Sequence, residues 1–598
     1  MSIQTPTQLR NNNLKAEIVR RGWKFNALAE RLGITNRHLS EVLAGRARLT
    51  HRLAIQIHET TDIPLRDIPY EAATRILVSD PIAEDGVNAL KQGGVEVDVK
   101  TGLPPDDLKA IIGDYQALVV RSETKVTKDI LGAAKGLQVV GRAGVGIDNI
   151  DVEAATERGV VVVNAPTGNT ISAAEHAVAL MLSLARHIPA ANASLKSGKW
   201  ERSKFMGLEV RGKTLGVIGL GQVGSEVARR ARGLEMRVVA FDPFVPEERA
   251  RVLGVDLLSL EDLLKECDFA TVHTTLTEGT RSLIGEEQLR TMKPTARVIN
   301  TARGGIIDET ALAKALTEGW IAGAAIDVFS KEPVTDHPLF GAPNIVVTPH
   351  LGASTAEAQE RVAVDVAEQI LAVLSGRPAR YAVNAPMIDP ETYAYLAPYL
   401  PVAFKVARLA VQLREGQLGE LAIDYSGDIA QHDTTPLKAA ALAGMLSIVS
   451  EDHVNVVNVD IIAQRRGIRI VETHSPSHEL YSNVIRVNVK GSAGEAHVSG
   501  TAAHDGPHIV SVDGFWVDIP PSEGYLLLCE NKDRPGMVGA IGTLMGEYGV
   551  NISFMNVGRH EKRGVALMVL ALDEQLAKDQ IARVKEISGI LGVKLAQL

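Results

Sequence analysis

The sequence contains little cysteine and no long hydrophobic run. Its two cysteines among 598 residues, Cys267 and Cys529, lie far apart and form no disulfide or metal-binding pattern, so we expect two inert core residues in a reducing compartment. No run of about 18 apolar residues occurs, and we therefore expect no transmembrane helix. The opening residues are polar and lack the basic and apolar segments of a secretory signal. Together these absences predict a cytoplasmic protein without a bound metal.

Low-complexity tracts and long tandem repeats are also absent. At roughly 150 residues per domain, the length predicts about four domains. Charge is distributed unevenly, because residues 1–70 hold eleven Lys or Arg against six Asp or Glu, a net +5, while the whole chain carries −9. The basic excess is therefore confined to the N-terminal segment.

Residues 14–62 predict short helices joined by tight turns. Ala29, Gly33 and Leu39 have the spacing that a helix-turn-helix needs, since a small Ala29 lets two helices approach and Gly33 supplies a turn with positive φ. The segment resembles phage-repressor-type DNA-binding domains. We therefore predict a small all-α helix-turn-helix domain over residues 1–70.

That resemblance implies a specific DNA-binding surface. Glu41 lies on the same predicted helix and would either read cytosine or remain in solvent. Residues predicted to face the major groove are Asn36, Arg37 and Ser40, and those predicted to meet phosphates are Arg46, Arg48 and Arg52. Two other interpretations stay open: a docking or dimerising cap, and a chance fusion remnant. The net −9 of the chain opposes DNA binding at long range.

From residue 74 the pattern changes to alternating strands and helices. Short β-branched runs such as "RILVSD", "ALVVRS" and "VVVVNAP" predict parallel strands covered on both faces. A second series begins at "KTLGVIGLGQVG" and ends at "NIVVTPHLG". Residues 390–520 have a mixed α+β pattern, and residues 524–598 follow the β-α-β-β-α-β order of ferredoxin-like domains. The predicted fold class is α/β, with two Rossmann-like domains followed by two α+β domains.

The segment "GLGQVG" predicts a dinucleotide site. It follows a predicted strand and opens a helix, so its glycines allow a tight turn, a close approach to pyrophosphate and close helix packing. The next strand ends in Asp242, whose carboxylate would bond the ribose hydroxyls of NAD and repel the extra phosphate of NADP. The predicted cofactor-binding residues are Gly219, Gly221, Gln222, Val223, Gly224, Asp242 and Asp327.

Catalytic candidates follow later apolar runs. Loops at the carboxyl ends of strands in an open α/β sheet line one crevice, so Arg303, Asp327, Glu332 and His350 can converge. Oxidation of a hydroxyl beside a carboxylate needs a base and a cation. His350 suits the base, with Glu332 orienting its ring, and Arg303 suits the carboxylate clamp. Gly304 and Gly305 would give the loop of Arg303 room beside a ligand.

Several of these motifs resemble one enzyme family. "LGVIGLGQVG", "NTARGGIIDE", "AAIDVFSKEP" and "TPHLGAST" resemble the D-2-hydroxyacid dehydrogenases, and "VVRSETKVT", "VVGRAGVGIDNID" and "GKWERSKFMG" are closest to the long-form phosphoglycerate dehydrogenases among them. The resemblance implies that Arg303, Glu332 and His350 are catalytic and that the protein is a homo-oligomer. It also implies a substrate domain over 74–168 completed by 352–376, an NAD domain over 169–351, an intervening domain over 390–520 and an ACT domain over 524–598.

The resemblance further implies oxidation of 3-phospho-D-glycerate to 3-phosphohydroxypyruvate in serine biosynthesis. That substrate carries a carboxylate and a phosphate, and it needs several cations. Arg121 and Arg142 lie at predicted strand ends facing the cleft, and Lys204 could also reach it. Two alternatives stay open: a dehydrogenase for another D-2-hydroxy acid, and a DNA-binding regulator that uses the dehydrogenase fold as a ligand sensor.

The last domain carries a predicted effector site. "NKDRPGMVG" and "YGVNIS" resemble ACT domains, whose turn before the first helix exposes backbone N–H groups to an amino-acid carboxylate. We expect L-serine as the effector. The predicted effector-binding residues are Asn531, Asp533, Arg534, Pro535, Gly536 and Asn551. The two asparagines could instead serve only as caps or turn residues.

Overall fold

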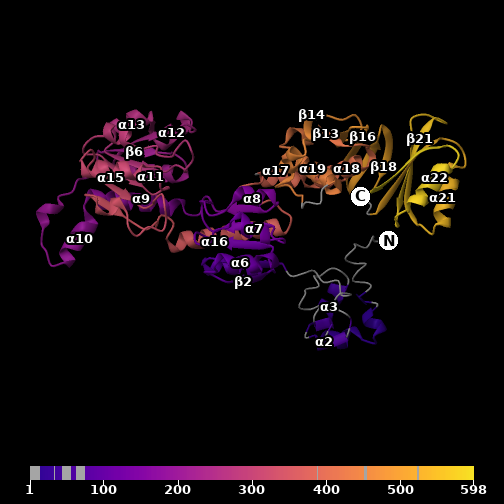
Figure 1. Ribbon diagram of the computed structural model, residues 1–598, viewed down its shortest axis with the longest axis horizontal. Helices are drawn as coiled ribbons and strands as arrows, with labels where there is room; N and C mark the ends of the chain where they lie inside the picture. Colours follow the sequence, from indigo (N-terminus) through magenta and orange to yellow (C-terminus); the bar gives the residue numbers. More distant parts are fainter. Residues whose placement is uncertain are drawn as a thin grey trace.

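A computed structural model describes residues 14, 15, 17–32, 34–43, 56–58, 60, 61, 63, 74–386, 388–449, 454–520 and 524–598. Four β-sheets follow one another along these residues. In Figure 1 the second sheet lies at one end of the molecule, the first in the middle, and the third and fourth at the other end.

The first sheet is parallel throughout, with the order β2-β1-β3-β4-β5. Its strands are β1 (Arg75–Val78), β2 (Glu96–Val99), β3 (Ala117–Val120), β4 (Val139–Arg142) and β5 (Val161–Asn164), and its helices are α5 (Glu84–Gln92), α6 (Pro105–Ile111), η2 (Ile112–Asp114), α7 (Lys128–Ala133) and α8 (Val152–Glu157). The short apolar runs thus form the buried parallel strands that the sequence predicts.

The chain returns to this sheet much later, through α16 (Ala356–Leu374). Val362, Val366 and Ile370 of α16 share one apolar core with Ile76 and Val78 of β1. The helix therefore covers one face of the first sheet.

The second sheet has seven parallel strands in the order β12-β11-β10-β9-β6-β7-β8. The strands are β6 (Thr214–Ile218), β7 (Arg237–Phe241), β8 (Asp256–Leu257), β9 (Phe269–Val272), β10 (Arg297–Asn300), β11 (Gly323–Ile326) and β12 (Ile345–Val347). The helices are α9 (Thr170–Ala185), α10 (Ile188–Lys196), η3 (Arg202–Phe205), α11 (Gln222–Gly233), α12 (Glu247–Leu253), α13 (Leu260–Glu266), α14 (Glu286–Thr291), α15 (Glu309–Thr317) and η4 (Pro338–Gly341). The strand order reverses between β6 and β9, and ligands of open α/β sheets bind at such a point.

The third sheet is mixed, in the order β14-β13-β15-β16-β17-β18. Its strands are β13 (Leu418–Gly427), β14 (Arg469–Ser475), β15 (Asn483–Gly491), β16 (Gly494–Ala503), β17 (Gly506–Val512) and β18 (Phe515–Ile519), and its helices are α17 (Pro390–Leu396), η5 (Ala397–Tyr399), α18 (Leu400–Leu413), η6 (Asp428–Gln431), α19 (Thr435–Val449) and α20 (Val459–Arg465). The predicted α+β pattern is confirmed.

One stretch of this region, Glu391–Leu413, is long and apolar enough to cross a membrane by composition. Two prolines, Pro398 and Pro401, interrupt it, and α18 within it packs its buried side chains on α19 and the third sheet. The apolar composition of this stretch is therefore that of a helix buried in a domain core.

The fourth sheet is antiparallel, in the order β20-β21-β19-β22. Its elements run β19 (Tyr525–Lys532), α21 (Met537–Glu547), β20 (Ile552–Arg559), β21 (Val565–Leu572), α22 (Lys578–Glu586) and β22 (Ile590–Gln597). This order confirms the predicted ferredoxin-like β-α-β-β-α-β domain.

The described N-terminal residues include α2 (Phe25–Arg31) and α3 (Asn36–Leu43). Ala29 and Leu39 are 2% and 0% exposed, and both belong to a small apolar core with Leu14, Ile18 and Ile57. Gly33 and the predicted phosphate-binding arginines 46, 48 and 52 lie outside the described residues. These helices thus have a core of their own.

Candidate active site

The glycine-rich loop after β6 has the geometry of a pyrophosphate site. Gly219 has φ +93°, and a Cβ there would lie 2.7 Å from the carbonyl oxygen of His273. A Cβ on Gly224 would lie 2.0 Å from the Gly219 carbonyl, whereas a Cβ on Gly221 would meet no atom within 4 Å. The first and third glycines therefore serve the turn and the packing of α11, and the second leaves open space at the helix N-terminus, where a pyrophosphate fits.

Asp242 lies beside this loop. Its Oδ2 accepts a hydrogen bond from the Leu220 amide at 2.8 Å, and its Oδ1 accepts one from the Phe244 amide at 2.9 Å. The hydroxyl oxygens of Thr274 and Thr301, after β9 and β10, are buried and have no partner in the described part of the chain. Buried polar groups normally find partners, so this crevice fits a ligand that carries hydroxyl and amide groups, as NAD does.

The two remaining loop residues support α11 instead. The hydroxyl of Thr170 donates to Gln222 Oε1 at 3.2 Å, which ties the start of α9 to the start of α11. Val223 packs on the apolar core between α9 and the second sheet. Their predicted contacts with the cofactor stay predictions.

Replacing Asp242 by alanine should lower the ratio of NAD to NADP efficiency (kcat/KM) by about tenfold or more, because the carboxylate bonds the ribose and repels a 2′-phosphate. Steady-state kinetics with both cofactors measures the ratio. The matched control is Asp256→Ala on the neighbouring strand β8, which pairs with Arg237 at 3.6 Å and should leave the ratio unchanged. An unchanged ratio in the Asp242 variant would place cofactor selection elsewhere.

His350 and Glu332 form a direct pair. His350 Nδ1 lies 2.6 Å from Glu332 Oε2, and Glu332 Oε1 accepts a hydrogen bond from the Phe329 amide at 2.9 Å. Burial opposes the charge of Glu332, but these hydrogen bonds outweigh it and lower the pKa of the carboxyl group. An ionised Glu332 accepts the proton of Nδ1, so Nε2 of a neutral His350 is left as a proton acceptor.

Asp327 holds the loop that carries His350. It is 0% exposed, and its carboxylate accepts hydrogen bonds from the Thr348 hydroxyl at 2.5 Å and from the amides of Leu351 at 2.8 Å and Gly352 at 2.9 Å. Its carbonyl oxygen also accepts the His350 amide at 2.8 Å. The structure thus gives Asp327 a part in positioning His350, and the predicted contact of Asp327 with the cofactor stays a prediction.

Arg303 reaches from the second sheet toward the first. Its Nε lies 3.5 Å from Asp148 Oδ2, and a Cβ on Gly146 would lie 2.2 Å from Arg303 Nη2. The expected room for a ligand beside Gly304 is wrong, because a Cβ there would lie 1.9 Å from the Phe329 carbonyl carbon. Gly304 instead allows the Arg303 loop to pack on the backbone next to Glu332.

Arg142 and Arg303 lie close together, since a Cβ on Gly144 would lie 2.8 Å from Arg142 Nη1 and a Cβ on Gly146 would lie 2.2 Å from Arg303 Nη2. Burial and the neighbouring charges of Arg303 and Arg121 lower the pKa of Arg142 to about 10. Asn149 joins Arg142 to the Arg121 loop, because its Oδ1 accepts from Arg142 Nε at 2.8 Å and its Nδ2 donates to the Arg121 carbonyl oxygen at 3.0 Å. A cluster of cations of this kind favours a ligand with more than one negative charge.

The cleft contains a cavity of about 570 Å³ between the two halves. Ser122, Glu123 and Lys125 line it from the first half, while Phe329, Glu332 and His350 line it from the second. Lys204 does not line this cavity. It lies on η3 with its side chain 67% exposed and pairs with Glu201 at 2.5 Å.

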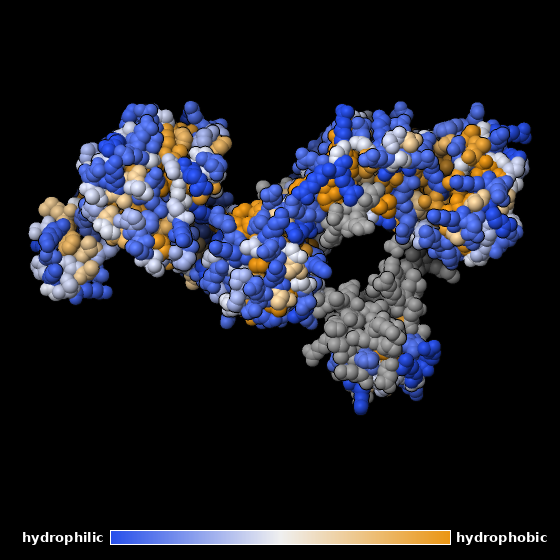
Figure 2. Space-filling model, in the orientation of Figure 1, coloured by the Kyte–Doolittle hydropathy of each residue, from blue (hydrophilic) through white to orange (hydrophobic). Residues whose placement is uncertain are grey.

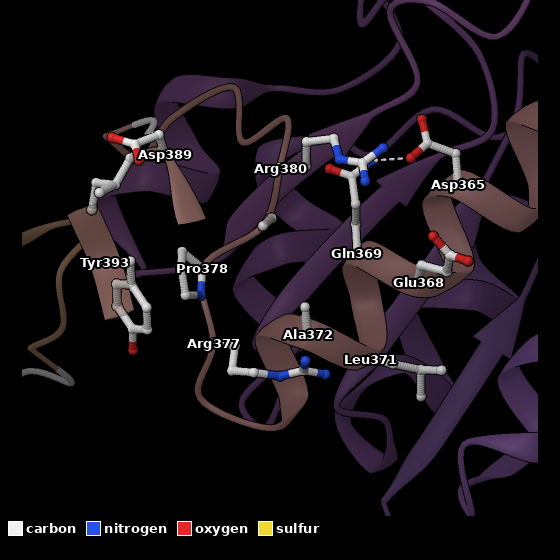
Figure 3. A pocket seen from close by; sticks show the side chains of 12 residues that line it. Asp365, Glu368, Gln369, Leu371, Ala372, Arg377, Pro378, Arg380, Asp389 and Tyr393 are labelled. Atoms are coloured by element: carbon white, nitrogen blue, oxygen red, sulfur yellow. Dashed lines mark hydrogen bonds between the residues drawn. The ribbon is translucent and has the colours of Figure 1, made fainter. Parts of the chain in front are cut away.

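A larger cavity, of about 720 Å³, lies outside the cleft. Figure 3 shows it between the end of α16, the segment around Arg377 and Arg380, and Tyr393 of α17. Its lining includes three acidic side chains, Asp365, Glu368 and Asp389, besides the two arginines, so it mixes both signs of charge. None of the predicted site residues lies there.

The predicted effector residues fall into two groups. Asn531 ends β19 and is 2% exposed, and its Oδ1 has no hydrogen-bond partner in the described residues. Asp533 accepts from Arg559 Nη1 at 2.7 Å, Arg534 donates to the Ser588 carbonyl, and Pro535 and Gly536 lead into α21. These residues therefore lie together at one end of the fourth sheet, and their predicted contact with an effector stays a prediction.

Asn551 lies at the opposite end of that sheet. Asn551 directly precedes Ile552, which pairs with Leu572 of β21. Leu572 also pairs with Tyr525 of β19, and Tyr525 lies six residues before Asn531. At about 3.3 Å per residue, the two asparagines are separated by about 20 Å along the strands. Asn551 Nδ2 donates instead to Asp573 Oδ2 at 2.6 Å. One chain therefore does not bring Asn551 to the other predicted effector residues.

Three family models match the chain. Residues 178–352 match the NAD binding domain of D-isomer specific 2-hydroxyacid dehydrogenases, residues 395–513 match the D-3-phosphoglycerate dehydrogenase intervening domain, and residues 525–589 match the ACT domain. The cofactor of the matched domain is NAD, as the glycine-rich loop and Asp242 predict. The domain boundaries expected from the sequence stay predictions.

Relatives match over most of their length. The chain is 48% identical over 518 residues to the D-3-phosphoglycerate dehydrogenase of Synechocystis sp., covering 86% of this chain and 93% of that one. It is 45% identical over 525 residues to the same enzyme of Methanocaldococcus jannaschii, covering 88% and 100%. The crystal structure of TT0316 protein from Thermus thermophilus is 37% identical, with a TM-score of 0.49, over 52% of this chain and 100% of that one. The chain belongs to the D-3-phosphoglycerate dehydrogenase family.

Proposed function

We propose that the protein oxidises 3-phospho-D-glycerate to 3-phosphohydroxypyruvate with NAD, a reaction that supplies serine biosynthesis. The observation that carries the proposal is the link of Arg142 to the Arg121 loop through Asn149, together with the cavity that residues 122–125 of this loop share with Glu332 and His350. A carboxylate and a phosphate on one small molecule match three cations, and a secondary alcohol matches a proton acceptor. The names of the relatives agree with this substrate.

The residues take separate parts in the reaction. Arg303 binds the substrate carboxylate, and Arg121 and Arg142 bind the phosphate, which fixes the C2 hydroxyl against His350. Nε2 of His350 accepts the hydroxyl proton as the carbonyl forms, and Glu332 stabilises the imidazolium. NAD, held by the glycine-rich loop and Asp242, supplies the acceptor for the C2 hydride.

A substrate panel with NAD tests the proposal. Turnover on 3-phospho-D-glycerate should exceed that on D-glycerate and D-lactate by orders of magnitude in kcat/KM, because the two smaller acids leave Arg121 and Arg142 without a partner. Comparable rates on all three would favour the alternative of a general D-2-hydroxyacid dehydrogenase. No turnover on any acid would favour a ligand sensor, although the intact His350–Glu332 pair is the arrangement of an active enzyme.

We also infer a homo-oligomer, formed through the arm that α10 and η3 make. Four large apolar side chains on this arm are exposed: Ile188 by 52%, Leu195 by 57%, Trp200 by 82% and Met206 by 82%. Figure 2 shows apolar side chains on this lobe, which projects from the second sheet. Exposed apolar groups in one place mark a protein contact, and a second copy of the chain is the occupant that we infer for it. Size-exclusion chromatography with light scattering measures the mass of the particle. A protein that is monomeric even at high concentration would contradict the inference.

A cytoplasmic location is the third part of the proposal. Cys267 and Cys529 are both free and buried, and burial raises the pKa of each thiol to about 12. The thiolate is the form that reacts with oxidants and binds metals, and a buried thiol with a raised pKa does not form it near neutral pH. Fractionation of the native cells, with the activity in the soluble fraction, is the expected result.

We infer in addition that L-serine binds between two ACT domains. The unpartnered Oδ1 of Asn531 and the turn at 533–536 offer donors and acceptors to an amino acid. Asn551 lies at the other end of the sheet, so a site with both asparagines needs two copies. Coupling to activity would then follow from a change in the contact between copies.

Replacing Asn551 by alanine should weaken serine binding by about fivefold or more and leave the rate without serine unchanged, since the residue is remote from the cleft. Calorimetry on the intact oligomer measures the dissociation constant. Asn556→Ala, on the same strand β20, is the matched control and should bind serine normally. No detectable binding of serine to the native protein would remove the effector from the proposal.

A second function is favoured by one observation, the separate apolar core of α2 and α3. Asn36, Arg37 and Ser40 are exposed on α3, as a recognition helix requires. Arg37 pairs with Glu41 at 3.0 Å, so contact with DNA would have to replace this ion pair. We propose that residues 1–70 bind DNA, and that a dimeric enzyme would present two copies to a palindromic site.

Deletion of residues 1–70 tests this second function. Dehydrogenase activity should survive, and binding of genomic DNA fragments at moderate salt should be lost. Arg37→Ala in the full chain should weaken that binding, and Arg20→Ala, an exposed arginine paired with Glu17, is its control. Equal binding by full-length and truncated proteins, or no binding at any salt, would leave a docking cap or a fusion remnant as the interpretation.

A further inference from the structure

A buried carboxylate holds the loop that carries Arg121. Asp80 follows β1 and is 1% exposed. Its Oδ2 accepts hydrogen bonds from the amides of Arg121 at 2.6 Å, Glu123 at 3.2 Å and Thr124 at 3.1 Å, and its Oδ1 accepts one from the Thr124 hydroxyl. A buried charge without partners is costly, so Asp80 and residues 121–124 fix each other's geometry.

Asn149 holds the same loop from the other side. Its Nδ2 donates to the carbonyl oxygens of Arg121 at 3.0 Å and Thr124 at 2.7 Å, and its Oδ1 accepts from Arg142 Nε at 2.8 Å. One amide side chain therefore joins the backbone of the Arg121 loop to the guanidinium of Arg142. Arg121 follows β3 and Arg142 ends the neighbouring strand β4, and the parallel pairing of these strands sets only the distance between the backbones.

We propose that Asp80 and Asn149 are positioning residues that hold Arg121 and Arg142 at the spacing of the substrate phosphate. Two guanidinium groups repel each other, and both side chains lose much conformational entropy when they are held in place. The hydrogen bonds of Asp80 and Asn149 fix the backbone that carries Arg121 and the guanidinium of Arg142 before the substrate arrives, so the free enzyme already presents much of the phosphate site. The proposal rests on the proposed function, because it takes the phosphate as the ligand of these arginines.

The experiment compares Asp80→Ala and Asn149→Ala with the wild-type full chain. KM for 3-phospho-D-glycerate should rise by about tenfold or more, while KM for NAD stays within about twofold. The preference for 3-phospho-D-glycerate over D-glycerate should fall by a similar factor, because D-glycerate lacks the phosphate. Asp80→Asn keeps the shape and one acceptor oxygen, and it should recover most of the loss.

Asp98→Ala is the matched control. Asp98 lies on β2 of the same sheet and accepts hydrogen bonds from Arg75 Nη2 and the Tyr115 hydroxyl, each at 2.7 Å, and neither partner belongs to the Arg121 loop. This variant should lower Tm and leave the substrate preference unchanged, which is the result expected of a purely structural residue. If Asp80→Ala does not fold, Asn149→Ala decides the outcome.

Wild-type KM and substrate preference in a folded Asp80→Ala or Asn149→Ala protein would overturn the proposal. Hydrogen exchange of the amides of Arg121, Glu123 and Thr124 separates it from the proposed function, since exchange needs no substrate. Suppose that the amides exchange faster in Asn149→Ala but that the enzyme oxidises another 2-hydroxy acid. The positioning of the loop by Asn149 would then stand, and the phosphate as the ligand of the arginines would be refuted. Unchanged exchange would refute the positioning itself.

Discussion

Replacing His350 by asparagine is expected to lower kcat by about 10³-fold, within the range that loss of a general base produces. Asparagine removes the proton acceptor Nε2 and cannot form an imidazolium against Glu332. The hydrogen bonds of Asp327 to the 348–352 loop go largely to backbone amides, so the loop should keep its conformation. Single-turnover kinetics on 3-phospho-D-glycerate measures the loss.

The cofactor provides the control for this variant. Binding of NADH, followed by fluorescence, should change by less than about threefold, because the glycine-rich loop and Asp242 lie on β6 and β7 and not on the His350 loop. A variant with near-native turnover would remove His350 from the reaction. Lost NADH binding together with lost turnover would show that the substitution disturbs the fold.

Replacing Arg303 by lysine should lower kcat/KM for 3-phospho-D-glycerate by about 10²-fold or more. The charge is retained, but a single ammonium group cannot bind a carboxylate through two parallel hydrogen bonds. The shorter reach also breaks the contact with Asp148, which joins the two halves at 3.5 Å. Steady-state kinetics at saturating NAD gives the value.

Arg297→Lys is the matched control for Arg303→Lys. Arg297 begins the strand β10 that leads to Arg303, and its Nη1 donates to the Thr295 carbonyl oxygen at 2.8 Å. This conservative change at the far end of the same strand should leave kcat/KM unchanged. If kcat/KM fell equally in both variants, the effect would come from a disturbance of β10 and not from the loss of a carboxylate clamp.

Much of the site could be predicted because its residues occur in local patterns. Gly219, Gly221 and Gly224 lie within six residues, and Arg303, Glu332 and His350 each follow an apolar strand, so the periodicity places them at the same edge of the sheet. In the structure His350 Nδ1 lies 2.6 Å from Glu332 Oε2, while the catalytic parts of these residues stay predictions.

Other features depend on contacts that no local pattern encodes. Asp80 precedes the loop it binds by about forty residues, and its role follows from the pairing of β1 with β3. Gly304 meets Phe329 because two loops cross, which a single loop sequence cannot show. Asn531 and Asn551 are close in sequence, but parallel strands β19 and β20 place them at opposite ends of one sheet.

The return of α16 to the first sheet has a consequence for synthesis on the ribosome. The face of that sheet containing Ile76 and Val78 is covered by Val362, Val366 and Ile370, which are translated after the entire second sheet. At about 5–20 residues per second, the roughly 200 intervening residues take on the order of 10–40 s. For that time the first five strands exist without their covering helix, whereas the second sheet is translated without interruption. The cofactor-binding half is therefore expected to fold first, and the half translated before it completes its core only afterwards.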